Sequence, residues 1–298
     1  MDKKEFQSRL FCKVPEEYEV VVTYTWANIS HGKVSGHIFE VIDYYLFLRR
    51  FFKVCIFIGD NKSYEDIITL VLDKYKENTV LEDIFFHNNP KILDASKQTV
   101  IVTDGAASYI FDRGGVVLYK NLIVFRCGGV PSFKSLESRK NVYLLQDNRV
   151  YLDKPNLPVL DYKKKILFSA LKDKTEQGTS AFLYITKNCR DYSIEEVKNS
   201  YNFESYLVCT GTPVPNLINR IHTYIYTPVF CKGTVQYKLD CSPRLIAECA
   251  YYNIDVLYHN IDYEDKGLEA RRHDIEHDFD SLRLEDSDYL VTFLRDLL

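Results

Sequence analysis

The sequence predicts an α/β protein built from two domains, and three observations point to this class. Apolar runs rich in β-branched and aromatic residues alternate with segments whose apolar residues recur at three- and four-residue steps. The order strand, helix, strand is typical of parallel sheets with crossover helices. The length of 298 residues favours two domains over one.

The amino-terminal half contains the first of these series. Residues 18–26 (YEVVVTYTW) predict a buried strand, and a polar, glycine-containing stretch follows it. A helix is expected over 37–51, because its apolar residues fall on one face. A second strand is expected at 53–59, a helix near 63–77, and further strands at 99–104, 121–127 and 141–146.

The second series begins after a connection at 153–165, which contains two prolines and little periodicity. We place the boundary between domains 1–157 and 158–298 there. Strands are expected at 165–171, 182–186, 205–211, 224–229 and 255–260, with helices near 193–200 and 242–253. Two Rossmann-like sheets in tandem fit this order, and they predict a ligand cleft between the domains, beyond the carboxyl ends of the strands.

Composition excludes several classes of protein. With 46% hydrophobic and 27% charged residues, the chain is expected to fold. It has no apolar run of about 20 residues and no signal-peptide pattern, which predicts no membrane span and a cytoplasmic location. The eight cysteines show no zinc-ligand spacing, so we expect reduced core residues and no metal site.

Charge is uneven along the chain. The net charge is -4, but residues 261–298 carry 12 acids and 5 bases, and the rest of the chain is therefore weakly basic. Basic clusters occur at Arg49-Arg50 with Lys53 and at Lys163-Lys164-Lys165. They are candidates for a basic groove, and the alternative is that they are solvated surface charges.

The most informative segment is 226–260, where a strand and a loop lead into a helix that starts at Ser242-Pro243. We expect Ser242 to be the N-cap and Pro243 the first helical residue. Glu248 lies on an apolar face of this helix, where a carboxylate needs a partner. Asp240 precedes Glu248 by eight residues, which gives the pattern D-x7-E.

This pattern resembles the E-x7-E motif of the GT-B glycosyltransferases. The resemblance implies that Asp240 faces the transferred sugar and that Glu248 accepts hydrogen bonds from the ribose. Two departures are Asp in place of the first Glu and the lack of a Gly-rich loop before the helix. The alternative is that Asp240 belongs to an ordinary loop and that Glu248 is a partly exposed helix residue.

The loop Asn28–Gly36 resembles the first loop of GT-B amino-terminal domains. Its glycines allow a close backbone approach, and it precedes a helix N-terminus, which favours an anion. The interpretation as a ligand loop makes it a contact for the acceptor or the diphosphate, with Lys33 as charge partner; the alternative is a simple turn. The loop residues concerned are Ser30, Gly32, Lys33 and Gly36.

Asp104 ends a predicted strand and is the first candidate for a general base that deprotonates an acceptor hydroxyl. Its alternative role is a helix cap. His31 is the reserve candidate, together with His37. The leaving diphosphate requires cations or backbone amides. For the donor, the candidates at strand ends or at the helix start are Lys172, Lys187, Arg190, Gly211 and Arg244.

These residues favour a metal-independent glycosyltransferase without a cofactor, which uses a nucleotide sugar such as a UDP-sugar. The residue usage also looks similar to phage and large-virus proteins, which include enzymes that glycosylate 5-hydroxymethylcytosine in DNA. The acceptor is therefore expected to be modified DNA, or else a glycan or protein; a viral enzyme would act in the host cytoplasm. The alternative function is non-catalytic binding of a nucleotide or sugar. The absence of a Walker A motif, and of a G-x-G-x-x-G motif after the first strand, argues against a kinase, an NTPase or a dehydrogenase.

Overall fold

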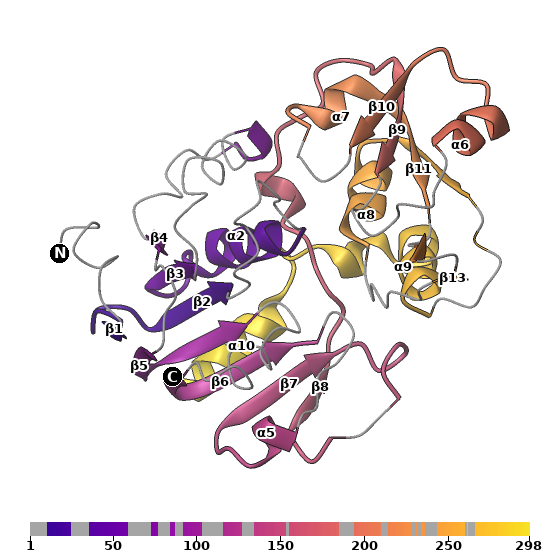
Figure 1. Ribbon diagram of the computed structural model, residues 1–298. Coiled ribbons are helices and arrows are strands. Elements are labelled where there is room, and N and C mark those ends of the chain that lie inside the picture. The colour runs from indigo at the N-terminus through magenta and orange to yellow at the C-terminus, as the bar shows by residue number, and fades with distance from the viewer. Residues whose placement is uncertain are drawn as a thin grey trace.

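The computed structural model describes most of the chain, drawn as coloured ribbon in Figure 1. The described residues are 11–24, 36–58, 73–76, 84–86, 92–102, 116–126, 134–152, 155–184, 194–209, 214–227, 230–231, 234–235, 243–259, 261 and 266–298. They form an α/β structure with two separate parallel sheets, as the alternating pattern predicts.

The first sheet has eight parallel strands among the described residues, in the order β4-β3-β2-β5-β6-β7-β8. The remaining strand, β1, pairs with the amino-terminal part of β5. Counted from β2, this is the order 3-2-1-4-5-6 of doubly wound sheets with one strand added at the edge. The strands are β1 (Phe11–Lys13), β2 (Val20–Tyr24), β3 (Val54–Ile58), β4 (Ile84–Phe86), β5 (Ile92–Val102), β6 (Val116–Phe125), β7 (Val142–Gln146) and β8 (Val159–Asp161).

The strand order of this sheet reverses between β2 and β5. Thr23 of β2 is in register with Val102, the last residue of β5. In open parallel sheets, ligands bind at such a reversal, outside the carboxyl ends of the strands. The chain continues from β2 into 25–35 and from β5 into 103–115; both segments lie outside the described residues.

Helix α2 (Gly36–Leu48) connects β2 to β3 and packs on the sheet. Its buried apolar residues belong to the same core as the sheet face beneath it. Glu40 and Asp43 are buried on this helix as well, so they require internal partners. A short helix, α5 (Lys134–Glu137), lies between β6 and β7.

In the part of the chain that the structure describes, the second sheet has four parallel strands in the order β10-β9-β11-β14. Their bounds are β9 (Ser180–Tyr184), β10 (Tyr206–Cys209), β11 (Ile221–Tyr226) and β14 (Asp255–Tyr258), each within three residues of the predicted bounds. The helices are α6 (Ile194–Ser200), α7 (Leu217–Arg220) and α8 (Arg244–Tyr251); the hairpin β12 (Phe230–Cys231) and β13 (Thr234–Val235) precedes α8. Here the order reverses between β9 and β11.

The predicted strand at 165–171 is wrong. Ile166 makes a single bridge to Arg283 and Leu171 a single bridge to Tyr75, and the 3-10 turn η3 (Phe168–Ala170) lies between them. The apolar residues of this segment are buried because they pack against α8 and the carboxyl-terminal region; Phe168, for example, stacks on Tyr251 with ring centroids 4.8 Å apart.

The last part of the chain returns to the first sheet. After α9 (Lys266–His277) and η4 (Phe279–Leu282), helix α10 (Asp288–Leu297) packs its buried residues into the core that contains α2. Asn121 of β6 donates its side-chain amide to the carbonyl of Leu297 at 3.0 Å. Both β8 and α10 therefore lie with the first sheet, although the predicted boundary assigned their residues to the second domain.

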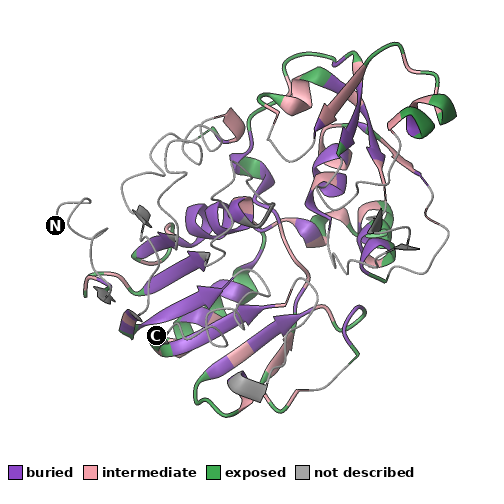
Figure 2. Cartoon of the chain, in the orientation of Figure 1, coloured by how far each residue is buried: buried purple, intermediate pink, exposed green. Residues whose placement is uncertain are grey.

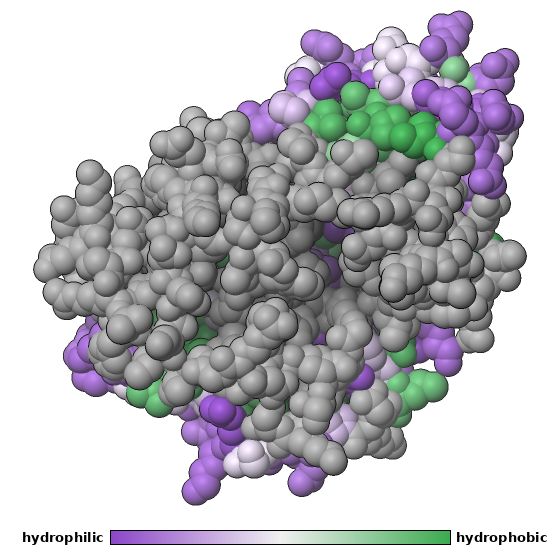
Figure 3. Space-filling model, viewed as in Figure 1, coloured by the Kyte–Doolittle hydropathy of each residue, from purple (hydrophilic) through white to green (hydrophobic). Residues whose placement is uncertain are grey.

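Burial follows the two sheets. Figure 2 shows the strands of the first sheet and α2 as mostly buried. Figure 3 shows a hydrophobic area in the region of α7 and β10, with mostly hydrophilic side chains above it and to its right. Within the described ranges, none of the helices has the length and apolar character needed to cross a bilayer.

Candidate functional site

Most of the predicted site residues lie outside the described ranges. These are the two candidate bases, the first acid of the D-x7-E pattern, three donor candidates and three loop residues: Asp104, His31, Asp240, Lys187, Arg190, Gly211, Ser30, Gly32 and Lys33. Gly36 is the first residue of α2. Their places in the sequence still matter, because the described strands fix where these segments begin and end.

Two predicted donor residues, Glu248 and Arg244, lie together on α8. Helix α8 begins at Arg244, one residue later than predicted, so Pro243 is its N-cap and not its first helical residue. The side chain of Glu248 is only 2% exposed. Its Oε1 accepts a hydrogen bond from Arg244 Nε at 2.5 Å, and its Oε2 accepts one from Lys74 Nζ at 2.6 Å. The predicted need for a partner on this apolar face is confirmed.

The guanidinium of Arg244 also contacts two residues from the first sheet's part of the chain. Arg244 Nη1 donates to Asp43 Oδ2 of α2, and Nη2 lies 3.4 Å from the hydroxyl of Tyr75. That hydroxyl is 2.8 Å from Asp43 Oδ1 and 3.0 Å from the carbonyl of Phe39, so its one proton serves either acceptor. A continuous chain of polar contacts thus joins α8 to α2.

We call Asp43, Lys74, Tyr75, Arg244 and Glu248 the α2–α8 cluster. Two carboxylates face two cations, so its formal charge is balanced. The ring of Phe39 lies beneath both cations, 4.3 Å from Lys74 Nζ and 5.7 Å from Arg244 Cζ, which adds cation–π attraction. Lys74 is the most exposed of the charged members, with 22% of its side chain accessible.

Burial and charge act against each other in this cluster. Burial raises the pKa of Asp43, against the opposite effect of Arg244. Burial alone would also raise the pKa of Glu248, but the charges of Lys74 and Arg244 outweigh it and hold this pKa below its ordinary value. Burial and the nearby Asp43 charge raise the pKa of Tyr75 far above its ordinary value, which keeps Tyr75 a neutral donor.

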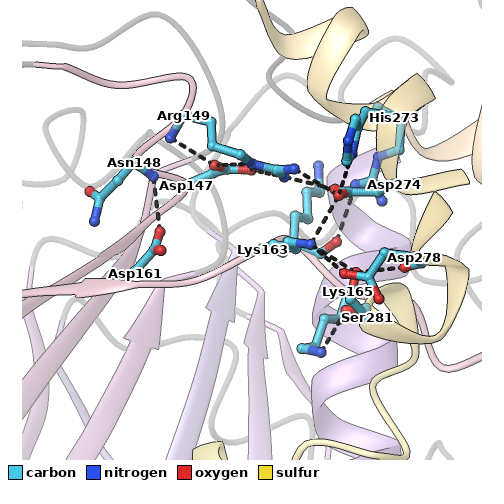
Figure 4. Close-up of polar contacts among 12 residues, drawn as sticks. Asp147, Asn148, Arg149, Asp161, Lys163, Lys165, His273, Asp274, Asp278 and Ser281 are labelled. Atoms are coloured by element: carbon cyan, nitrogen blue, oxygen red, sulfur yellow. Dashed lines mark hydrogen bonds and ion pairs between the residues drawn. The ribbon is translucent and has the colours of Figure 1, made fainter.

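A second group of charges surrounds Asp274, a buried carboxylate of α9, as Figure 4 shows. Arg149, which follows β7, binds both oxygens of Asp274 at 2.7 Å and also contacts Asp147. Lys163 donates to Asp274 at 2.9 Å and to Asp278 at 2.8 Å. We call Asp147, Arg149, Lys163, Asp274 and Asp278 the α9 cluster.

The α9 cluster explains part of the charge asymmetry seen in the sequence. Two acids of the carboxyl-terminal region, Asp274 and Asp278, pair with Arg149, which follows β7, and with Lys163, which follows β8. Burial alone would raise the pKa of Asp274, but its hydrogen bonds with Arg149 and Lys163 lower it below the ordinary value. The hydrogen bond from Lys163 also lowers the pKa of Asp278.

The basic cluster at 163–165 is engaged inside the protein. Lys163 binds the α9 cluster, Lys164 pairs with the buried Glu40 of α2, and Lys165 donates to the carbonyl of Ser281 at 2.6 Å. Both earlier interpretations of this cluster, a basic groove and solvated surface lysines, are therefore wrong. These three nitrogens hold the connection against α2 and the carboxyl-terminal region.

Lys172, predicted to follow a strand as a phosphate ligand, lies in the connection between the sheets. Its backbone N–H donates to the backbone carbonyl of Lys74 at 3.0 Å, and its own carbonyl accepts from the Tyr252 hydroxyl at 2.6 Å. This backbone pairing ties the connection to the segment that carries Lys74 and Tyr75.

The sequence interpretation missed Asp43, Lys74 and Tyr75. Asp43 carried a signal, since it interrupts the apolar face of the predicted helix 37–51 as Glu248 does in its own helix. Lys74 and Tyr75 carried none, because they occupy a short segment without a clear period.

Comparisons with protein-family models, with curated proteins and with solved structures find no match. In the part of the chain that the structure describes, no three His, Cys, Asp or Glu side chains gather as a metal site would require.

Proposed function

We propose that the chain is a glycosyltransferase of the GT-B kind, which transfers a sugar from a nucleoside-diphosphate donor to an acceptor hydroxyl. One observation carries the proposal: each parallel sheet has a reversal of strand order, and the segments that follow the strands there contain the predicted ligand residues. In the first sheet, 25–35 and 103–115 follow β2 and β5. In the second, Lys187 and Arg190 follow β9, and Asp240 lies between β11 and α8, after the hairpin β12–β13.

The contact between α2 and α8 adds support. A crossover helix begins on the carboxyl side of its sheet, so Arg244, the first residue of α8, belongs to the ligand side of the second sheet. Arg244 binds Asp43 of α2, and α2 in turn begins directly after the predicted loop of the first sheet. This contact supports a site between the two sheets, at which the donor and the acceptor meet.

In this proposal the donor interacts with the second sheet and the acceptor with the first. Asp240 contacts the sugar, and Glu248 holds a ribose hydroxyl through the acceptor capacity that its two cation contacts leave. Lys187, Arg190 and the backbone near Gly211 oppose the charge of the leaving diphosphate. Asp104 is the general base, with His31 in reserve.

A glycan or protein acceptor is favoured over DNA in this proposal. Binding a DNA backbone requires exposed cations. The three lysines at 163–165 are one of the two basic clusters available for this task. Their side chains instead bind carboxylates and a backbone carbonyl of this same chain. Hydroxymethylated DNA remains one arm of the test.

The test is release of nucleoside diphosphate from a panel of UDP-, GDP- and ADP-sugars, with glycan, protein and hydroxymethylated DNA acceptors. Acceptor-dependent release supports a transferase. Donor binding without turnover on every acceptor would favour the non-catalytic alternative, and absence of donor binding would overturn both.

Asp104→Asn tests the proposed base. Because this substitution removes the proton acceptor and leaves the donor contacts in place, transfer should fall by about two to four decades at unchanged donor affinity. Steady-state rates and donor titrations measure the two quantities separately. Normal turnover would show that Asp104 is a helix cap.

A further inference from the structure

Two residues that no motif singled out, Asp43 and Tyr75, belong to the first sheet's part of the chain but bind the first residue of α8. Asp43 accepts from Arg244, and the Tyr75 hydroxyl lies between the two. Asp43 is fully buried and so is the ring of Tyr75. Their contacts therefore fix the guanidinium inside the protein, where water does not compete for it.

Fixing this guanidinium fixes more than one side chain. Arg244 is also bound to Glu248 one turn further along α8, and Lys74 binds the other oxygen of that carboxylate. A shift of Arg244 would therefore move the carboxylate of Glu248.

The α9 cluster provides a comparison of like chemistry. It too has a buried carboxylate, here Asp274, bound by an arginine and a lysine, and it too joins distant parts of the chain. It contains none of the residues predicted to bind the donor. The two clusters thus separate a general contribution to stability from an effect on the donor site.

We propose that Asp43 and Tyr75 are positioning residues of the donor site, which act through Arg244 on Glu248. This inference rests on the proposed function. The affinity for the donor, which binds on the second sheet's side, then depends on Asp43 and Tyr75, two residues from the first sheet's part of the chain that do not touch the donor.

The test compares two variants with two matched controls in the full chain. Asp43→Asn removes the charge that holds Arg244, and Asp274→Asn makes the same change in the α9 cluster. Tyr75→Phe removes one buried hydroxyl, and Tyr162→Phe removes another, which is bonded to Tyr44 at 2.9 Å. The tyrosine pair keeps the test decisive if an aspartate variant does not fold.

Melting temperatures are measured first, and then the Kd values of UDP, GDP and ADP are determined by calorimetry well below the lowest melting temperature. We expect Kd for the nucleotide that the wild type binds to rise about tenfold in Asp43→Asn and about threefold in Tyr75→Phe. Both controls should keep the wild-type Kd although their melting temperatures fall. In donor hydrolysis, KM should rise in the two variants while kcat stays within about twofold.

The outcomes separate this inference from the proposed function. If the wild type binds none of the three nucleotides, the proposed function fails and the inference fails with it. If the wild type binds one of them and variants and controls have equal Kd values, Asp43 and Tyr75 are purely structural and the inference alone is overturned.

Discussion

At the scale of single residues, Glu248 has both a structural and a proposed functional role, and its charge can be tested for stability alone. Glu248→Gln keeps the shape but leaves Lys74 and Arg244 with one carboxylate, Asp43, between them. Because it leaves a buried positive charge unpaired, we expect the free energy of unfolding to fall by about 3 to 5 kcal/mol, as measured by urea denaturation.

Glu276→Gln is the control for this variant, because that side chain is 57% exposed on α9. It should change the free energy of unfolding by no more than about 0.5 kcal/mol. Equal losses in the two variants would show that the α2–α8 cluster contributes little to stability.

Donor binding gives the second prediction at this scale. Glu248→Ala removes the carboxylate that the proposed function assigns to the ribose, so the Kd of the donor should rise on the order of tenfold or more in calorimetric titrations. An unchanged Kd would restrict Glu248 to its structural contacts with Lys74 and Arg244.

The candidate site was only partly predictable from the sequence, for a physical reason. A carboxylate on an apolar helix face needs a partner, and this predicted that Glu248 would be paired. The partners could not be named, because Lys74 is 174 residues from Glu248 and Asp43 is 201 residues from Arg244. Contacts at such separations depend on how the two sheets pack.

At the scale of elements, α10 covers one face of the first sheet. Leu294→Ala should lower the free energy of unfolding by about 2 to 5 kcal/mol, because it leaves a cavity at a fully buried position. Thr292 is exposed on the same helix, so Thr292→Ala serves as the control and should have little effect. Equal effects in urea denaturation would mean that α10 does not pack as described.

Gly178, which precedes β9, permits a close approach of two backbone segments. A Cβ at this position would lie 2.1 Å from the backbone nitrogen of Ile221, at the start of β11. Gly178→Ala should therefore lower the melting temperature markedly, with a cost of about 1 to 3 kcal/mol or more from overpacking. Ser180→Ala, two residues later, should cost less, and the reverse order would contradict this geometry.

Strands were predicted well where the sequence has a buried β-branched run, as in β2 and β3. The segment 165–171 is equally apolar but forms a 3-10 turn, since a short apolar run does not distinguish a strand from another buried segment. In α10, Leu290, Leu294 and Leu297 recur at helical spacing, a signal that the acidic composition of 261–298 masks.

At the scale of the whole molecule, the α9 cluster makes stability depend on pH. The pKa values of Asp274 and Asp278 are lower in the folded protein than their ordinary value of 3.8. Such groups stabilise the fold above the ordinary pKa, and their contribution is lost as pH falls through the folded-state pKa. We expect the free energy of unfolding to decrease below about pH 4.

Asp43 acts in the opposite direction, because burial raises its pKa. To isolate the effect of Asp274, the free energy of unfolding is measured by urea denaturation from pH 7 to pH 3 in the wild type and in Asp274→Asn, which both contain Asp43. Stability of the variant should fall less steeply with acid. Parallel curves would show that Asp274 does not titrate with unfolding.

The return of α10 to the first sheet also has a consequence for how the chain is made. A ribosome translates all the described strands of both sheets before it reaches residue 288, so the face that α10 covers stays open until residues 288–297 have been made. Nascent chains stalled before that residue should expose this face, and a protease should cut them in the first sheet although all its strands have been synthesised. A stalled chain extended through Leu298, with α10 outside the ribosome, should resist the protease.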